Sequence, residues 1–258
     1  MFGRHVILRP IVPGVLQVPL FGTSAFLLLG DRVTLVDTGF RGSGVRLLRA
    51  VQAAGRRADE IERVIITHYH PDHLGGLAEL QQVLPAKAAI HAVEASVVMS
   101  TAGPPSPFGN LALRIAAHPF GRRAFRFSPV RIDEFLHDGD EFQILGGMRV
   151  VHTPGHTSGH ISLYFPDLAL LIAGDSLESH NGAIRGPTPL FSINMKEAQR
   201  SVRKLAGLEV DVIALSHFPA ISKGASQQLL AYANGLGNSS AIAGDSVPTA
   251  GLRALLPT

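Results

Sequence analysis

One short segment, residues 67–76, constrains this chain more than any other part of the sequence. It follows the apolar run of residues 64–66 and ends in two glycines, so it is expected to form a loop at the end of a strand. The loop carries three histidines and one aspartate, namely His68, His70, Asp72 and His73. Imidazole and carboxylate groups suit zinc and related divalent ions, so the segment predicts a metal site. A histidine-rich surface turn is the alternative, but it would not need a β-branched strand in front of it.

Composition narrows the kind of protein that carries this segment. The 258 residues include no cysteine, which excludes disulfides and a closed cysteine-rich zinc site and favours a catalytic or exchangeable metal site. The formal net charge is +3, too small for the field of a dedicated nucleic-acid binder. No apolar run approaches the roughly 20 residues that span a bilayer, and residues 1–9 lack the apolar core of a signal peptide. We therefore expect a cytoplasmic protein that does not associate with a membrane.

The order of apolar runs predicts an α/β (α+β) fold with two strand-rich halves. Short runs between residues 6 and 37, separated by proline and glycine, predict an antiparallel meander. Strands and helices then alternate, with one helix expected over residues 76–83. Residues 141–215 repeat this outline, and a helix is expected to follow Asn194. Two such halves predict two sheets stacked face to face with helices outside.

Two segments depart from this pattern. Residues 103–130 contain five prolines and four phenylalanines interleaved with arginines, and we interpret them as an insertion. A lid whose phenylalanines close a pocket is favoured, and contact of its arginines with RNA or a phosphate-bearing substrate is the alternative. We expect residues 1–236 to form a single domain and residues 237–258, which are rich in small residues, to form a flexible tail.

Three later strands are each expected to end in a further metal ligand. His156 follows the strand near residues 148–152, Asp175 follows an apolar run that ends at Ala173, and His217 follows the last expected strand. Ligands placed just past several strand ends would converge on one edge of a sheet sandwich. The candidate ligands are therefore His68, His70, Asp72, His73, His156, Asp175 and His217.

In combination, these motifs resemble those of the metallo-β-lactamase fold superfamily. Residues 68–73 match its HxHxDH motif, His156 its TPGH histidine, Asp175 its GD aspartate and His217 its last histidine. The resemblance covers about residues 12–236 and implies a four-layer αββα sandwich with an internal repeat. Residues 153–160 also resemble the glyoxalase II subgroup. A bridging aspartate such as Asp175 argues against the class B β-lactamases, which usually lack it.

The resemblance further implies two divalent metal ions, most simply zinc, with iron or manganese as alternatives. One ion would be held by His68, His70 and His156. The other would be held by Asp72, His73 and His217, and Asp175 would bridge the two. Asp37, which matches the DTG segment of the family, would orient a ligand histidine.

Such a centre predicts a binuclear metallohydrolase. The charge of two divalent ions and two aspartates would keep a bridging hydroxide deprotonated near neutral pH, ready to attack the carbonyl carbon of a small ester, lactone or thioester. Asp72 would be the catalytic residue that carries the proton to the leaving group. The alternatives are a phosphodiesterase or nuclease of the same fold, and an iron-dependent persulfide dioxygenase or oxygen reductase. We expect a small-molecule substrate and no binding to nucleic acid or to a membrane. Whether the chain forms a homo-oligomer stays open.

The remaining histidines are expected to be surface or hydrogen-bonded structural groups. His180, together with Tyr69 and Phe218, lies close to the candidate ligands in the sequence, so these three residues are candidates for substrate contact. Because a ligating imidazole must be neutral, metal and activity should be lost below about pH 6.

Overall fold

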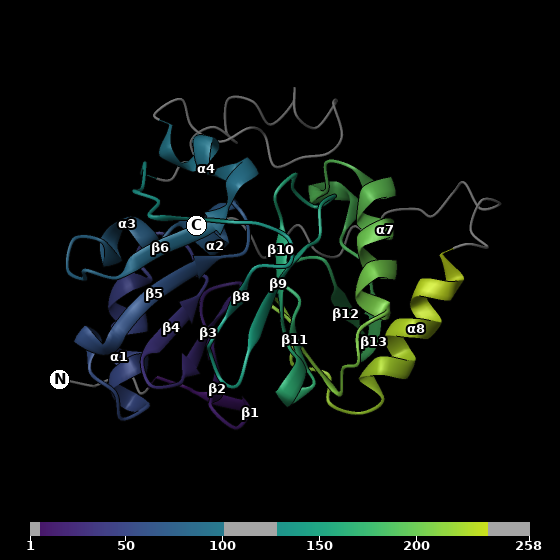
Figure 1. The fold of residues 1–258 in the computed structure, drawn as a ribbon, viewed down its shortest axis with the longest axis horizontal. Coiled ribbons are helices and arrows are strands. Elements are labelled where there is room, and N and C mark those ends of the chain that lie inside the picture. Colours follow the sequence, from purple (N-terminus) through teal and green to yellow (C-terminus); the bar gives the residue numbers. More distant parts are fainter. Residues whose placement is uncertain (1–5, 101–127, 237–258) are drawn as a thin grey trace, which may run out of the picture.

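Residues 6–100 and 128–236, which a computed structural model describes, build two large sheets that lie face to face (Figure 1). The first sheet holds seven strands in sequence order: β1 (Arg9–Val12), β2 (Val15–Pro19), β3 (Ser24–Leu29), β4 (Val33–Val36), β5 (Ile61–Ile66), β6 (Lys87–His91) and β7 (Glu134–Leu136). The strands from β1 to β4 pair antiparallel, and those from β4 to β7 pair parallel. The expected meander is therefore present, although its first strand begins at Arg9.

The second sheet holds five strands in the order β14 (Val212–Ala214), β11 (Leu170–Ile172), β10 (Ile161–Phe165), β9 (Met148–His152) and β8 (Glu141–Phe142). Only β11 and β14 pair parallel in this sheet, and the other neighbours pair antiparallel. A separate hairpin, β12 (Glu178–His180) and β13 (Ala183–Arg185), follows β11. The sequence pattern did not predict this hairpin, because its strands have three residues each and no apolar run.

Side chains along the strands alternate between three apolar layers. In β3, Leu27 faces the layer outside the first sheet and Phe26 faces the layer between the sheets. In β10, Leu163 shares the layer of Phe26, and Tyr164 faces the layer outside the second sheet. Because successive side chains of a strand point to opposite faces, each sheet has two covered faces.

Helices supply the outer walls of these layers (Figure 1). The first sheet is covered by α1 (Gly44–Ala53), α3 (Leu77–Leu80) and α4 (Ala92–Met99), and α2 (Pro71–Leu74) lies in the loop after β5. The second sheet is covered by α7 (Met195–Ala206) and α8 (Ala225–Gly235). Three single 3₁₀ turns connect these elements: Ala58–Glu60, Pro166–Leu168 and Pro189–Phe191. The αββα sandwich expected from the sequence is confirmed.

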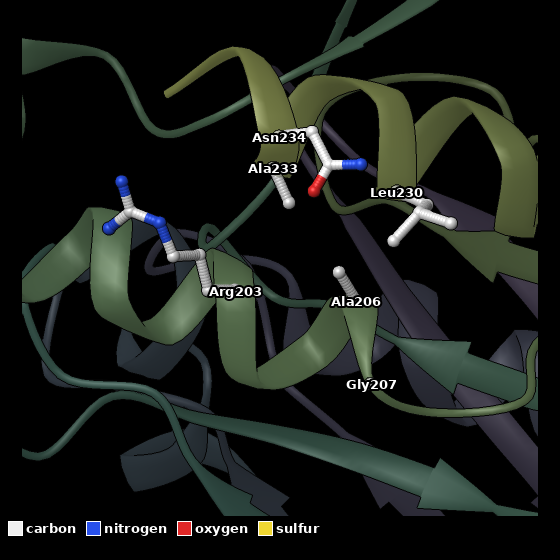
Figure 2. A pocket seen from close by; sticks show the side chains of 6 residues that line it. All are labelled: Arg203, Ala206, Gly207, Leu230, Ala233 and Asn234. Atoms are coloured by element: carbon white, nitrogen blue, oxygen red, sulfur yellow. The ribbon is translucent and has the colours of Figure 1, made fainter. Parts of the chain in front are cut away.

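Two of the expected segments fall mainly outside the described residues. The insertion near 103–130 is described only from residue 128, and the tail at 237–258 is not described. Within the described ranges, every helix is too short or too polar to cross a membrane. An open pocket lies between the helices α7 and α8 (Figure 2). It is lined by Arg203, Ala206, Gly207, Leu230, Ala233 and Asn234, none of which is a candidate ligand.

Candidate metal centre

The candidate ligands lie just past the C-terminal ends of four strands, β5, β9, β11 and β14. After β5 the chain carries His68 and His70, and Pro71 then occupies the first position of α2. Proline suits this position, because its fixed φ matches a helix and its missing N–H would have no helical partner there. The resulting turn places Asp72 and His73 on the first turn of α2, directly beside the two histidines that precede it.

A first group of ligand atoms comes from His68, His70 and His156, all three buried. Their ligand atoms lie within 4.8 Å of one another. Nε2 of His156 is 3.0 Å from Nδ1 of His70. The His68 ring lies nearly perpendicular to the His156 ring, with centroids 4.8 Å apart, so the imidazoles meet at their edges rather than stack. This arrangement aims nitrogen lone pairs from two loops at one position.

A second group comes from Asp72, His73 and His217. Oδ2 of Asp72 lies 3.5 Å from Nε2 of His73 and 3.5 Å from Nε2 of His217. His73 is fully buried, whereas the side chain of His217 is 27% exposed. The second group therefore opens toward the solvent and the first group does not.

Asp175 contacts both groups. Its Oδ2 lies 3.5 Å from Nε2 of His156 in the first group and 3.1 Å from Nε2 of His217 in the second. Its Oδ1 lies 3.4 Å from Nε2 of His73. One carboxylate thus joins the loops that follow β5, β9 and β14.

These side chains fit divalent cations. Nε2 of His68, Nε2 of His73 and Oδ1 of Asp175 are buried without a hydrogen-bond partner, an arrangement that is costly unless a cation satisfies the atoms. Zinc bonds of about 2.0–2.1 Å in a tetrahedral site separate neighbouring ligand atoms by roughly 3.3 Å. The separations of 3.0 Å between His70 and His156 and of 3.4 Å between His73 and Asp175 are of this size. The donor set implies divalent metal ions.

In the first group the protonation states also suit metal binding. Burial lowers the pKa of His68 and of His156 well below the usual 6.5 and lowers that of His70 to about 4. These imidazoles are therefore neutral near pH 7, as ligands must be. At His217, burial acts to lower the pKa, but the charge of Asp175 outweighs it and raises the pKa to about 9. The carboxylates of the second group thus favour positive charge between them.

Asp37 contacts His73 of the second ligand group. It is buried, with a φ of 61° that side chains rarely permit, and it accepts the Thr67 N–H at 2.8 Å through Oδ1. Its Oδ2 lies 2.8 Å from Nδ1 of His73. The carboxylate therefore holds the proton of His73 on Nδ1 and leaves Nε2 facing the ligand group.

The variant Asp37→Asn should weaken metal binding by roughly 10- to 100-fold. Its amide oxygen can still accept the Thr67 N–H, but its amide nitrogen then faces Nδ1 of His73 and drives the ring proton to Nε2. Competition with a chromophoric chelator measures the affinity. Asp31→Asn, at an exposed position, is the matched control. An affinity equal to that of the unmodified protein would contradict this role.

Two buried residues beside the ligands were not singled out from the sequence as part of the site, although His160 was among the histidines expected to be surface or hydrogen-bonded structural groups. His160 is fully buried, accepts the Asp175 N–H at 2.9 Å through Nε2, and contacts the Thr153 hydroxyl through Nδ1. Glu94, from α4, contacts the backbone of both histidine loops. The spacing of four between His156 and His160 was the one sequence signal for the first, and Glu94 had none.

The three candidates for substrate contact lie in different places. Tyr69 is 4% exposed and packs in the layer outside the first sheet, with its ring 5.1 Å from that of His70. His180 is exposed on β12, and its ring lies 5.8 Å from that of Phe218. Beside them, the Gly22 carbonyl accepts a hydrogen bond from Nδ1 of His217 at 2.7 Å. Phe21, next to Gly22 and 74% exposed, was not singled out from the sequence.

Comparisons with known proteins agree with this geometry. A sequence model described as the metallo-beta-lactamase superfamily matches residues 18–217. "Probable metallo-hydrolase YflN" of Bacillus subtilis is 30% identical over 218 residues, which cover 78% of this chain and 81% of that protein. A "Hydroxyacylglutathione hydrolase" of Fuscovulum blasticum is 30% identical over 207 residues, which cover 78% of this chain and 65% of that protein.

Solved structures show the same fold. The crystal structure of a metallo-beta-lactamase family protein from Thermus thermophilus superposes with a TM-score of 0.66 at 25% identity, over 88% of this chain and 79% of that one. The chain thus matches the family model, a named metallo-hydrolase and this structure. It also carries a cluster of histidines and aspartates that could hold metal ions. The chain belongs to the metallo-β-lactamase superfamily and is a metal-dependent hydrolase.

Proposed function

We propose that the protein hydrolyses a small acyl substrate, an ester, a lactone or a thioester, at a centre that binds two divalent metal ions. The observation that carries the proposal is the position of Asp175, which lies within 3.5 Å of a histidine of each ligand group. Relatives whose printed name is hydroxyacylglutathione hydrolase act, by that name, on a thioester and therefore favour acyl transfer to water.

The proposed ligands divide between the two ions as the two groups do. The first ion would take His68, His70 and His156. The second would take Asp72, His73 and His217, with Asp175 shared. Nitrogen and oxygen ligands without thiolates suit zinc first, and iron or manganese next. Bound there, divalent ions would lower the pKa of a water molecule and polarise a carbonyl oxygen.

Asp72 is the residue to which we assign proton transfer. Burial acts to raise its pKa, but the neighbouring His73 outweighs this effect and lowers the pKa to about 2, so the group is a carboxylate near pH 7. Its side chain is 20% exposed and belongs to the ligand group that opens toward solvent. Oδ2 of Asp72 could therefore accept a proton on the substrate side of the site and return it to the leaving group.

Aromatic side chains beside His217 favour a substrate with an apolar part. Phe21 exposes 74% of its surface, and the neighbouring Gly22 binds His217 through its carbonyl. Phe218 follows His217 directly, with its ring close to that of His180. The Phe21 ring is exposed and the Phe218 ring is partly buried, and apolar side chains around a few polar groups are typical of ligand-binding sites. We propose that the acyl group lies against Phe21 and Phe218.

The test combines metal analysis with a substrate panel. Protein loaded separately with zinc, manganese and iron(II) is assayed on a lactone, an aryl ester, a glutathione thioester of a hydroxy acid, a β-lactam and a phosphodiester. We expect about two metal ions per chain and turnover of at least one acyl substrate. Phosphodiester cleavage without acyl hydrolysis would overturn the proposal. So would a single iron with consumption of oxygen.

The variant Phe21→Ala should raise KM for substrates with a long acyl chain by roughly 3- to 10-fold, which corresponds to about 1 kcal/mol of lost apolar contact. It should leave kcat unchanged, because the ring contacts bound substrate and transition state alike. Steady-state kinetics on acyl chains of increasing length measure the effect. Leu230→Ala, on α8 and also exposed, at 50%, is the control. A KM that does not change with chain length in Phe21→Ala would contradict this contact.

A further inference from the structure

Glu94 is a buried carboxylate with no role in the ligand groups described above. It lies in the first turn of α4, whose preceding residue His91 caps the helix by accepting the Val93 N–H through Nδ1. The helix end is thus capped by another side chain, and Glu94 itself points inward with 1% of its surface exposed. Burying a carboxylate costs several kcal/mol, so the contacts that hold this one need a reason.

Those contacts join two loops that are distant in the sequence. Oε2 of Glu94 accepts the Tyr69 N–H at 2.6 Å. Oε1 accepts the Gly159 N–H at 3.0 Å and a short hydrogen bond from the Thr157 hydroxyl. Tyr69 stands between His68 and His70, and Thr157 directly follows His156. A single side chain therefore binds the loop that carries two members of the first ligand group and the loop that carries the third.

The backbone around Glu94 is fitted to this arrangement. A Cβ atom added to Gly159 would lie 2.5 Å from Cγ of Glu94 and 3.1 Å from Nδ1 of His91, so a larger residue would push the loop away from α4. On its other side, the loop is held by the start of α7. The Asn194 N–H donates to the Gly155 carbonyl at 2.9 Å, and the Ile193 N–H donates to the His156 carbonyl at 3.2 Å. The loop that carries His156 is therefore held by contacts with both α4 and the start of α7.

The contacts of Glu94 require a hydrogen-bond acceptor and not a counter-ion. Among the described residues, Glu94 makes no ion pair within 4.0 Å, and its partners are two backbone N–H groups and a hydroxyl. Three donors converging on two oxygens need a group that only accepts, and a carboxylate is the side chain that does so. A glutamine would turn one N–H₂ group toward an N–H donor and leave that donor without a partner.

We propose that Glu94 is a positioning residue that sets the separation of His70 and His156, and with it the affinity and geometry of the first metal ion. The inference rests on the proposed function, since it assumes that the first group binds a metal. It adds a residue from α4, outside both histidine loops, to the determinants of the metal centre. Removing one acceptor should let the loops move apart while the second group stays intact.

The test compares Glu94→Gln with the unmodified protein in cobalt(II) titrations. We expect the variant to bind one of two cobalt ions roughly 10- to 100-fold more weakly and to show an altered visible absorption band for that ion. Glu79→Gln is the matched control, because Glu79 also accepts two backbone N–H groups, from Gly42 and Gly44, but contacts neither histidine loop. It should leave both affinities and the absorption spectrum unchanged.

The outcomes separate the two proposals. Two cobalt ions bound with unchanged affinity and spectrum in Glu94→Gln would overturn the role of Glu94 and leave the proposed function in place. An unmodified protein that binds no cobalt would overturn both. If Glu94→Gln fails to fold, Thr157→Val removes one of the three donors without leaving an N–H unpaired. The same weakening, smaller in size, is then expected, and unchanged cobalt binding would overturn the role.

Discussion

Asp175→Asn is expected to lower kcat/KM by roughly 10³-fold and to reduce the bound metal from about two ions to one per chain. The substitution keeps the volume of the side chain and removes its charge. Because Asp175 lies within 3.5 Å of His73, His156 and His217, the loss acts on both ligand groups at once. No other described carboxylate lies this close to nitrogens of both groups.

Steady-state kinetics and elemental analysis of the same preparation measure this effect. The control is Asp211→Asn, an exposed aspartate next to β14, the strand that leads to His217. It should retain full activity and both ions. The bridging role of Asp175 would be contradicted by a variant that keeps two ions and turns over at the normal rate. It would also be contradicted by a loss of activity that added zinc restores completely.

The clustering of the candidate ligands could be predicted from the sequence because each of them stands just past the end of a strand. A histidine or aspartate two to four residues past an apolar run is visible without a structure, as at Asp175 and His217. The αββα layering could be predicted for a similar reason, since short apolar runs alternating with helices leave two sheets to cover. Contacts between distant residues left no such trace. Glu94 and Thr157 are 63 positions apart, and nothing near either residue marks the other.

The bounds of the short helices after β5 were predicted less well. One helix was expected over residues 76–83, whereas the chain forms α2 and α3 with Gly75 and Gly76 between them. Gly76 is the N-cap residue of α3, and a Cβ on it would lie 2.5 Å from the Thr38 carbonyl oxygen, so this position also needs glycine for the close passage of two chain segments. At α7, Asn194 accepts the Glu197 N–H as expected of a helix cap.

The metal-free protein is expected to lose several kcal/mol of stability as the pH falls from about 6.5 to about 4. Burial lowers the pKa of His70 to about 4 and that of His160 to about 3, and it lowers the values of His68 and His156 well below 6.5. Between the folded and unfolded pKa values, the unfolded chain binds more protons. Acid therefore favours unfolding by about 1.4 kcal/mol per pH unit for each such group.

Three groups act in other ways. Burial acts to lower the pKa of His73, but the charges of Asp175, Asp72 and Asp37 outweigh it and raise the pKa well above 6.5, so this group loses its contribution only as the pH rises. The pKa of His217 is raised to about 9, so its contribution is complete below pH 6.5 and is lost as the pH rises toward 9. Burial raises the pKa of Glu94 to about 7, so the folded chain takes up the extra proton between 4.5 and 7. That uptake opposes the histidines, but it offsets only one of them, since the pKa of His91 is also lowered, by burial, to about 4. The metal-free protein should therefore be most stable near neutral pH.

Urea unfolding of chelator-treated protein at intervals from pH 4.5 to 9 measures this profile. His160→Gln removes one of these titrating imidazoles while retaining an acceptor for the Asp175 N–H, so it should flatten the acid limb by up to about 1.4 kcal/mol per pH unit. His137→Gln, at an exposed histidine, should leave the slope unchanged. A stability that stays constant between pH 6.5 and 4.5 would show that these imidazoles are not held neutral by burial. These imidazoles would then carry protons before metal binding, and the metal ion would have to displace those protons to bind.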